Sequence, residues 1–290
     1  MFNTLVFLIR TDIFASVSTC NHRNYFVGMS RKVIFCNCGA KLIGAERIGA
    51  ILEYLTESQY PFSVISDLCG CSVDRINKLH ALFLDADEYL IIACYPRAVG
   101  LLLENCGIDL HSKKFNYLNF REMKNYQILA DISIFFSGET EMGHSDELIS
   151  NTEWPSWFPV IDYSRCNTCG QCADFCLFGV YEKTDNKVVV VNPKGCKNNC
   201  PACGRICPQT AIVFPKYEHE GAIAGADAID EIAEQQRQQH DINTILGSNI
   251  YKALEVRKAK RQSIIRSSAM QLAIDEREKA LLEKKSNNAL

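Results

Sequence analysis

Short apolar runs alternate with amphipathic stretches between residues 31 and 137. The runs have the length and the Val, Ile and Phe content of buried strands. We expect strands at Val33–Phe35, Phe62–Ile65, Tyr89–Ala93 and Phe115–Phe120. Between them apolar residues recur every three or four positions, which predicts helices over 45–58, 73–83 and 99–105, and the apolar stretch 125–136 should finish the domain. Strands that alternate with helices indicate an α/β domain with a parallel sheet.

The pattern changes after residue 137. Residues 138–158 are acidic and rich in Gly, Ser and Thr, which predicts a linker. Residues 159–216 have the pattern of a few short strands, with a hairpin turn at Asp185 and Asn186, and predict a small α+β domain. Residues 217–290 are polar and predict a helical tail, with helices over 226–240 and 249–285. Residues 1–30 are expected to be an N-terminal extension, with Met29 as the start of translation.

Two apolar features leave a choice between internal packing and partner binding. Trp154, Trp157 and Phe158 stand beside prolines at the start of the small domain, and such large aromatic side chains favour burial. We expect them to pack on the small domain or to join it to its neighbour, with a partner surface as the alternative. The apolar stripe of the tail has no regular heptad, so the tail is either a solvated helix with one edge on the body or a docking helix.

Eight cysteines between residues 166 and 207 follow two repeated spacings. Residues 166–176 are C-x2-C-x2-C-x3-C, and residues 196–208 are C-x3-C-x2-C-x3-C-P. A [4Fe–4S] cluster needs four thiolates, and in this arrangement one run supplies three while the other supplies the fourth. The first predicted cluster has the ligands Cys166, Cys169, Cys172 and Cys207. The second has the ligands Cys196, Cys200, Cys203 and Cys176.

Two other kinds of site use parts of this pattern. A tetrahedral zinc site uses paired C-x2-C units and does not account for two runs of four cysteines. The spacing C-x3-C-x2-C also holds the cluster of radical S-adenosylmethionine enzymes. Those enzymes follow the motif with a partial barrel, and only 87 of the 290 residues follow Cys203. The spacing therefore favours two iron–sulfur cubes.

Residues 160–216 resemble the two-cluster bacterial ferredoxins, through both cysteine runs and Pro208. The resemblance implies a small domain that carries two [4Fe–4S] clusters and exchanges single electrons with a redox partner protein. Two positions depart from the family pattern. Three residues, 197–199, separate the first two cysteines of the second run, and Leu177 stands where proline is more common.

Further cysteines lie where the strands of the α/β domain are expected to end. Functional groups collect at this edge because the carboxyl ends of parallel strands meet there. Four thiolates are what a cube requires, so we expect a third [4Fe–4S] cluster, with buried or redox-active thiols as the alternative. Its expected ligands are Cys36, Cys38, Cys69 and Cys94, with Cys71 as a replacement for Cys69. Cys106 is expected to be a core thiol.

A second resemblance rests on the sequences FCNCG at 35–39, DLCG at 67–70 and IACYPR at 92–97. Through them, residues 32–125 resemble the N-terminal domain of the A subunit of heterodisulfide reductases, which implies an iron–sulfur site at these positions. Tyr95 departs from the family, which more often has a small residue there. An enzyme of that type needs a flavin, and flavin binding needs a turn such as G-x-G-x-x-G. The sequence has no such run, so no flavin is expected.

Composition sets the remaining expectations. The net charge of −3, with 22% charged residues, gives no general attraction to nucleic acid or membranes. The apolar stretch at residues 5–9 is too short for a signal peptide or a membrane span. Fifteen cysteines at metal-binding spacings indicate a reducing compartment, the cytoplasm of an anaerobic or facultative organism. We expect an electron carrier or oxidoreductase subunit rather than a stand-alone enzyme, with a redox sensor or scaffold as the alternative.

Overall fold

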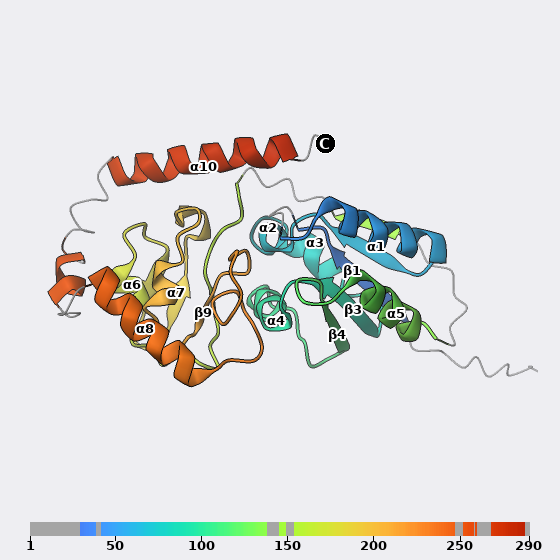
Figure 1. The fold of residues 1–290 in the computed structure, drawn as a ribbon, viewed down its shortest axis with the longest axis horizontal. Helices are drawn as coiled ribbons and strands as arrows, with labels where there is room; N and C mark the ends of the chain where they lie inside the picture. The colour runs from blue at the N-terminus through green and yellow to red at the C-terminus, as the bar shows by residue number, and fades with distance from the viewer. Residues whose placement is uncertain are drawn as a thin grey trace, which may run out of the picture.

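The computed structural model describes residues 30–38, 42–137, 145–148, 154–246, 252–257, 259 and 268–287. They form an α/β domain, a cysteine-rich module at residues 154–230 and a set of C-terminal helices (Figure 1). The expectations for residues 1–29, including a start at Met29, lie outside the described residues. None of the described helices is long and apolar enough to cross a membrane.

Five parallel strands form the sheet of the α/β domain, in the order β4-β3-β1-β2-β5. Their bounds are β1 (Arg31–Cys36), β2 (Phe62–Ile65), β3 (Glu88–Ala93), β4 (Lys114–Asn119) and β5 (Ser145–Leu148). β1 and β3 are buried along almost their whole length, as expected for a parallel sheet that helices cover on both faces. The predicted parallel sheet is confirmed.

The edge strand β5 differs from the expectation for its part of the chain. Ser145–Leu148 lies inside residues 138–158, which were expected to be a linker, yet it pairs with β2 from Phe62 to Ile65. An open strand edge leaves backbone N–H and C=O groups unpaired, and β5 pairs those of β2. Backbone pairing of this kind needs no apolar pattern, which is why the acidic sequence did not reveal the strand.

Helices cover both faces of the sheet (Figure 1). α1 (Ala45–Ser58) and α5 (Asn125–Phe135) lie on one face, and α2 (Leu68–Asp74), α3 (Ile76–Ala81) and α4 (Pro96–Asn105) lie on the other. The helix predicted over 73–83 was wrong in its bounds, because it is broken at Arg75 and begins at Leu68. Asp67 caps α2 by accepting a hydrogen bond from the Gly70 N–H (3.2 Å). Cys69 and Cys71 therefore lie in the first turn of α2 instead of in a loop.

The cysteine-rich module is built from very short elements. β6 (Val160–Ile161) pairs antiparallel with β9 (Ile212–Val213), and β7 (Tyr181–Lys183) pairs antiparallel with β8 (Val188–Val190). The pair β7 and β8 is the predicted hairpin around Asp185 and Asn186. The helices are α6 (Gln171–Phe175), α7 (Ala202–Arg205) and the short 3-10 helix η1 (Pro193–Gly195). Irregular loops that carry cysteines connect these elements.

Arg97 fixes the α/β domain to the module. Its Nε donates to Asp162 Oδ2 (2.9 Å), and its two terminal nitrogens donate to the carbonyls of Thr210 (3.1 Å) and Ala222 (3.2 Å). The side chains of Arg97 and Asp162 are almost buried, so the charge pair is shielded from water. Arg97 opens α4 directly after β3, so this contact orients the carboxyl edge of the sheet toward the module.

The aromatic segment before β6 joins the same two parts. Trp157 stacks on Phe214, with ring centroids 5.1 Å apart, and packs inside the module. The Trp154 Nε1–H donates to Asp74 Oδ2 (2.9 Å) at the end of α2. Trp157 therefore packs on the small domain and Trp154 joins it to its neighbour, which are the two internal arrangements expected from the sequence.

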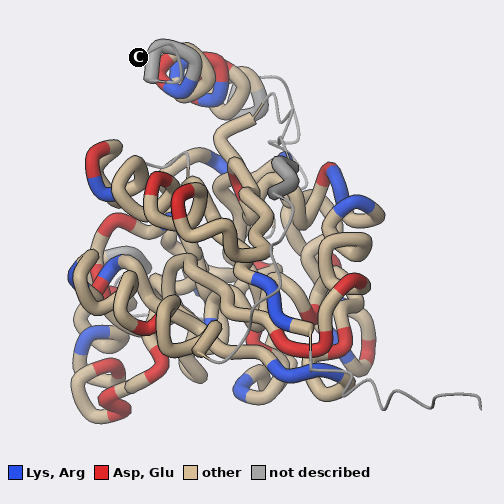
Figure 2. Tube along the Cα trace, turned by 90° about the vertical axis from the view of Figure 1, so that its right-hand side faces the viewer, with Lys and Arg blue, Asp and Glu red and all other residues tan. Residues whose placement is uncertain are grey.

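The C-terminal helices lie on the body of the protein. α8 (Glu231–Leu246) is tied to the module by Arg205 and Asp241 (2.7 Å), and a helical segment follows at residues 252–257. α10 (Ser268–Asn287) runs over both the module and the α/β domain (Figure 1). Basic and acidic positions are interspersed along it (Figure 2). The long helix predicted over 249–285 is therefore replaced, in the described residues, by two separate helical stretches.

We predict that Arg97→Met lowers the free energy of unfolding by about 3 kcal/mol, because it leaves the buried Asp162 carboxylate without its cation. Urea unfolding followed by tryptophan fluorescence measures this, since Trp154 contacts α2 across the interface and Trp157 packs inside the module. The matched control is Arg165→Gln, which breaks a more exposed pair with Glu231 and should cost about 0.5 kcal/mol. Equal effects of the two substitutions would contradict the role given to Arg97.

Candidate functional site: three sets of four thiols

The first set of thiols lines a small pocket in the cysteine-rich module. Cys166, Cys169, Cys172 and Cys207 surround it together with apolar neighbours that include Ile212. The pKa of the Cys172 thiol is raised to about 12, chiefly by burial and then by the nearby Cys207, Cys169 and Cys166. The structure thus brings together the four residues that the spacing predicted as one ligand set.

The second set of thiols gathers in the same module. Burial raises the pKa of Cys196, and the nearby Cys176 and Cys200 add to this. Burial also raises the pKa of Cys203, and Cys196, Cys176 and Cys200 act on it in the same direction. The fourth thiol of each set therefore comes from the other cysteine run, as the spacing predicted.

The loops of both sets use the same backbone device. In each loop the residue directly before the second cysteine has a left-handed backbone conformation, with φ 59° at Thr168 and φ 55° at Asn199. The longer second loop therefore reaches the same local conformation, and its additional residue lies earlier in the loop. Gly170 follows Cys169 with φ 82°, and any side chain there would collide with Lys183, whose Nζ donates to the Cys169 carbonyl (3.1 Å).

The donor set fits a cluster better than a single ion. In the part of the chain that the structure describes, every cysteine is a free thiol, and no three His, Cys, Asp or Glu side chains converge closely enough to hold one metal ion. A tetrahedral zinc site would need Sγ atoms about 2.3 Å from one centre. Four thiols spread around a common space, all without acidic neighbours in the set, match the ligands of a [4Fe–4S] cube.

Hydrogen bonds reach the thiols from groups that the sequence did not single out. The buried Tyr181 hydroxyl donates to Cys203 Sγ (3.0 Å), and the Ala211 N–H donates to Cys207 Sγ (3.4 Å). Donors of this kind stabilise negative charge on sulfur and tune a bound metal group. The sequence showed Tyr181 as an apolar strand residue, and only its position opposite α7 makes it a donor.

A third set of thiols lies at the carboxyl edge of the parallel sheet. Cys36 ends β1, Cys94 follows β3, and Cys69 lies in the first turn of α2 after β2. β1 stands between β2 and β3, so the carboxyl ends of all three strands are neighbours. This is the point where the strand order reverses direction, and the three residues meet there. Burial raises the pKa of Cys36, and Cys38, Cys94 and Cys69 contribute in the same direction. The four predicted residues are therefore neighbours.

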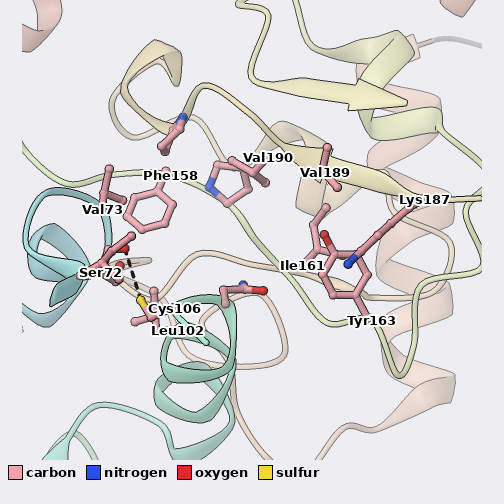
Figure 3. A pocket seen from close by; sticks show the side chains of 14 residues that line it. Ser72, Val73, Leu102, Cys106, Phe158, Ile161, Tyr163, Lys187, Val189 and Val190 are labelled. Atoms are coloured by element: carbon pink, nitrogen blue, oxygen red, sulfur yellow. Dashed lines mark hydrogen bonds between the residues drawn. The ribbon is translucent and has the colours of Figure 1, made fainter. Parts of the chain in front are cut away.

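Cys71, the alternative to Cys69, lies apart from this set. Cys71 is buried, and its thiol lies near that of Cys106, which stands at the end of α4. Figure 3 shows the pocket next to Cys106, where its Sγ–H donates to the Ser72 carbonyl (3.3 Å) and Tyr163 and Lys187 form the far wall. The position of Cys106 agrees with a core thiol. Among the lining residues of this pocket there is no second cysteine.

Cations from other parts of the chain surround the third set. Lys216 of the module is buried, and its Nζ donates to Asp67 Oδ2 (2.7 Å) and to the Pro155 carbonyl (3.0 Å). Burial lowers the pKa of Lys216, but Asp67, Cys69 and Cys38 outweigh it and the net pKa is raised. The positive charge of Lys216 is therefore held directly beside these thiols.

Arg121 supplies a second cation to the same site. Burial raises the pKa of Cys94 to about 12, and the Arg121 charge opposes this effect. Its guanidinium lies 4.9 Å from the centre of the Tyr95 ring and donates to the Tyr217 carbonyl (3.0 Å) of the module. Tyr95, an unusual residue for the resembled family, is thus a buried platform for an arginine that bridges the two parts.

The chain is similar to an uncharacterized ferredoxin of Methanocaldococcus jannaschii, with 49% identity over 61 residues. The match covers 21% of this chain and 42% of that protein, so the chain spans less than half of the relative's length. No protein-family model matches the chain, and no solved structure matches it. The similarity supports a ferredoxin-like region in the chain.

We predict opposite effects for two substitutions at the left-handed positions. A β-branched residue is strained at positive φ, whereas Asn tolerates it, so Thr168→Asn should raise the free energy of unfolding by about 1 kcal/mol. Asn199→Thr should lower it by a similar amount. Thermal unfolding under anaerobic conditions measures both. Shifts of the same sign would show that at least one loop has a different backbone conformation.

Proposed function

We propose that this chain is an iron–sulfur electron-transfer protein whose cysteine-rich module holds two [4Fe–4S] clusters. The observation that carries the proposal is the separation of eight thiols into two sets of four, each completed by a cysteine of the other run. Similarity to a protein named as a ferredoxin supports the same class. A bound [4Fe–4S] cluster supplies reversible one-electron chemistry, and the protein supplies burial, hydrogen bonds and contact with partners.

We assign contact with a redox partner to the first set, because one of its thiols is exposed. Cys169 is exposed, whereas Cys172 and Cys207 of the same set are buried. A partner protein can therefore approach the first set at the Cys169 loop. Cys172 and Cys207 are enclosed by the module, and Cys166 is half-buried.

The chain just before the second set contacts the α/β domain. Lys194, two residues before Cys196, pairs with Asp74 at the end of α2 (2.5 Å). α2 also carries Cys69 of the third set in its first turn. In our proposal the second set thus connects the partner-facing first set with the α/β domain.

We further propose a third [4Fe–4S] cluster on Cys36, Cys38, Cys69 and Cys94. The neighbourhood of the four thiols and the cations Lys216 and Arg121 support it, because a buried group with four thiolate ligands needs positive charge nearby. The sequence resemblance to the N-terminal domain of the heterodisulfide reductase A subunit points to the same site. The three sets would then form a relay for single electrons between a donor and an acceptor in a reducing compartment.

A redox titration separates this function from that of a sensor or scaffold. An electron carrier should show reversible one-electron reduction of each cluster at low potential, with no change in its binding to partners. A sensor should instead lose iron on oxidation and change its helical contacts. Anaerobic EPR during the titration, followed by gel filtration of the oxidised and reduced protein, distinguishes the two outcomes.

The iron content tests the two sets in the module. Anaerobically purified protein should contain at least about eight iron atoms per chain, since each cube holds four. Cys169→Ala should remove about four of them and leave the other iron in place. Zinc instead of iron under these conditions would overturn the proposal.

The third cluster has its own test in the full-length chain. Cys94→Ser should lower the iron content by about four atoms per chain, because it removes one of four ligands. The matched control Cys106→Ser changes a buried thiol of the same domain that lies outside the set, and it should leave the iron content unchanged. If Cys94→Ser retains all iron, the thiols of the α/β domain are core residues and the relay has two clusters.

A further inference from the structure

Two arginines of the C-terminal helices reach the second set of thiols. Arg277 of α10 donates from Nη2 to the carbonyl of Cys196 (2.8 Å). Its guanidinium carbon lies 6.0 Å from the centre of the Trp154 ring, on the side of the module that faces α2. The salt bridge between Glu276 and Lys197 (3.0 Å) holds the same turn of α10 on the same loop.

Arg257 approaches the set from the helical segment 252–257. Its guanidinium carbon lies 4.2 Å from the centre of the Phe175 ring, next to Cys176 in the chain. Leu254 fixes this segment by packing with Phe175 and Ile206 in a small buried cluster. Burial lowers the pKa of Arg257, and the nearby Cys200 opposes this shift. The cation therefore lies within electrostatic reach of a predicted ligand.

Both cations are held where they lose hydration. Burial lowers the pKa of Arg277, with Cys196 acting against it, and the buried Nε of Arg277 has no hydrogen-bond partner. Among the described residues neither arginine forms an ion pair with a carboxylate; the acid beside Arg277, Glu276, pairs with Lys197. A partly buried cation is stabilised by negative charge nearby, and among the described residues both arginines lie near cysteines of the second set, which would carry negative charge as thiolate ligands of a cluster.

We propose that Arg257 and Arg277 provide the positive charge that stabilises the reduced second cluster, so that the C-terminal helices set its reduction potential. The inference rests on the proposed function, since it assigns a role toward the cluster on Cys196, Cys200, Cys203 and Cys176. Reduction brings in one electron and so adds one negative charge to a group that already carries four thiolates. A nearby fixed cation favours the state with the additional negative charge and raises the potential.

The first set has a different electrostatic environment. The cation beside it is Lys183, which contacts the carbonyl of the exposed Cys169 from the edge of the β7 and β8 hairpin. Water and salt screen an exposed charge far more than a buried one. The C-terminal arginines should therefore act on the second cluster and leave the first unchanged.

The test is an EPR-monitored redox titration of the full-length, anaerobically prepared protein. A unit charge about 12 Å from the centre of the cluster, at an effective dielectric constant of about 20, changes such an equilibrium about tenfold. Arg277→Gln and Arg257→Gln should each lower the midpoint potential of the second cluster by about 59 mV, the equivalent of a tenfold change for one electron. Repeating the titration in a background with both Cys169→Ala and Cys94→Ser, which removes ligands of the other two proposed clusters, assigns the signal to the second cluster.

Two control variants separate charge from structure. Arg277→Lys keeps the charge and should retain most of the potential, whereas a purely structural role of Arg277 would make it resemble Arg277→Gln. Lys279→Gln removes the same charge from an exposed position of α10 and should leave both clusters unchanged. Arg257 only stacks on a ring, so Arg257→Gln gives an independent answer if Arg277→Gln disturbs the loop.

The outcomes distinguish this inference from the proposed function. Unchanged potentials in both glutamine variants, or an equal shift in Lys279→Gln, would overturn the role of the arginines while the clusters remain. Absence of a second cluster from the unaltered protein, by iron content and EPR, would overturn the proposed function itself.

Discussion

Burial of thiols in groups of four is the physical constraint on which the rest of this structure depends. A thiol in an apolar interior resists ionisation, as the raised pKa values of Cys36, Cys172 and Cys203 show. The thiolate form that binds iron must be stabilised by the metal group, by hydrogen bonds or by cations. The chain places such groups at every set: the Ala211 N–H at the first, the Tyr181 hydroxyl at the second, and Lys216 at the third.

The cations also explain why the α/β domain and the module form one unit. Lys216 belongs to the module but neutralises Asp67, the cap of the helix that carries Cys69. Lys284 of α10 reaches the same carboxylate (3.1 Å), so three distant parts of the chain meet at one buried acid. Burial raises the pKa of Asp67, but Lys216 and Lys284 outweigh it and the net pKa is lowered. Contacts that hold the parts together are therefore the same contacts that set the charge around the third set of thiols.

The C-terminal helices extend this arrangement to the second set. Their sequence is polar, and several apolar side chains of α10 remain exposed, among them Leu272 and Leu282. The helix is held mainly by polar contacts, namely those of Arg277, Glu276 and Lys284. Isolated contacts of this kind contribute little when exposed, and they gain strength where the partner is buried, as Asp67 is. In the proposed relay these helices would cover the inner cluster, and the Cys169 loop would remain open to a partner.

The sequence by itself determined the elements whose signal is local. Apolar runs gave the strands of the sheet, since a strand buried on both faces must be apolar throughout. Cysteine spacing gave both thiol sets of the module, because ligands carried by one short loop have few ways to surround a cluster. The position of cysteines at the predicted strand ends indicated the third set, because the carboxyl ends of parallel strands lie at one edge of the sheet.

Only the tertiary structure decided the features that depend on residues far apart in the chain. The strand β5 pairs through its backbone, so its acidic sequence had no strand pattern. α2, capped at Asp67, places Cys69 near Cys94 and Cys38, whereas Cys71 of the same turn lies near Cys106. Lys216 and Arg277 are ordinary surface types in the sequence. They become neighbours of the thiol sets because folding brings Lys216 to the Asp67 carboxylate and Arg277 to the Cys196 carbonyl, contacts that a charge pattern along the chain does not encode.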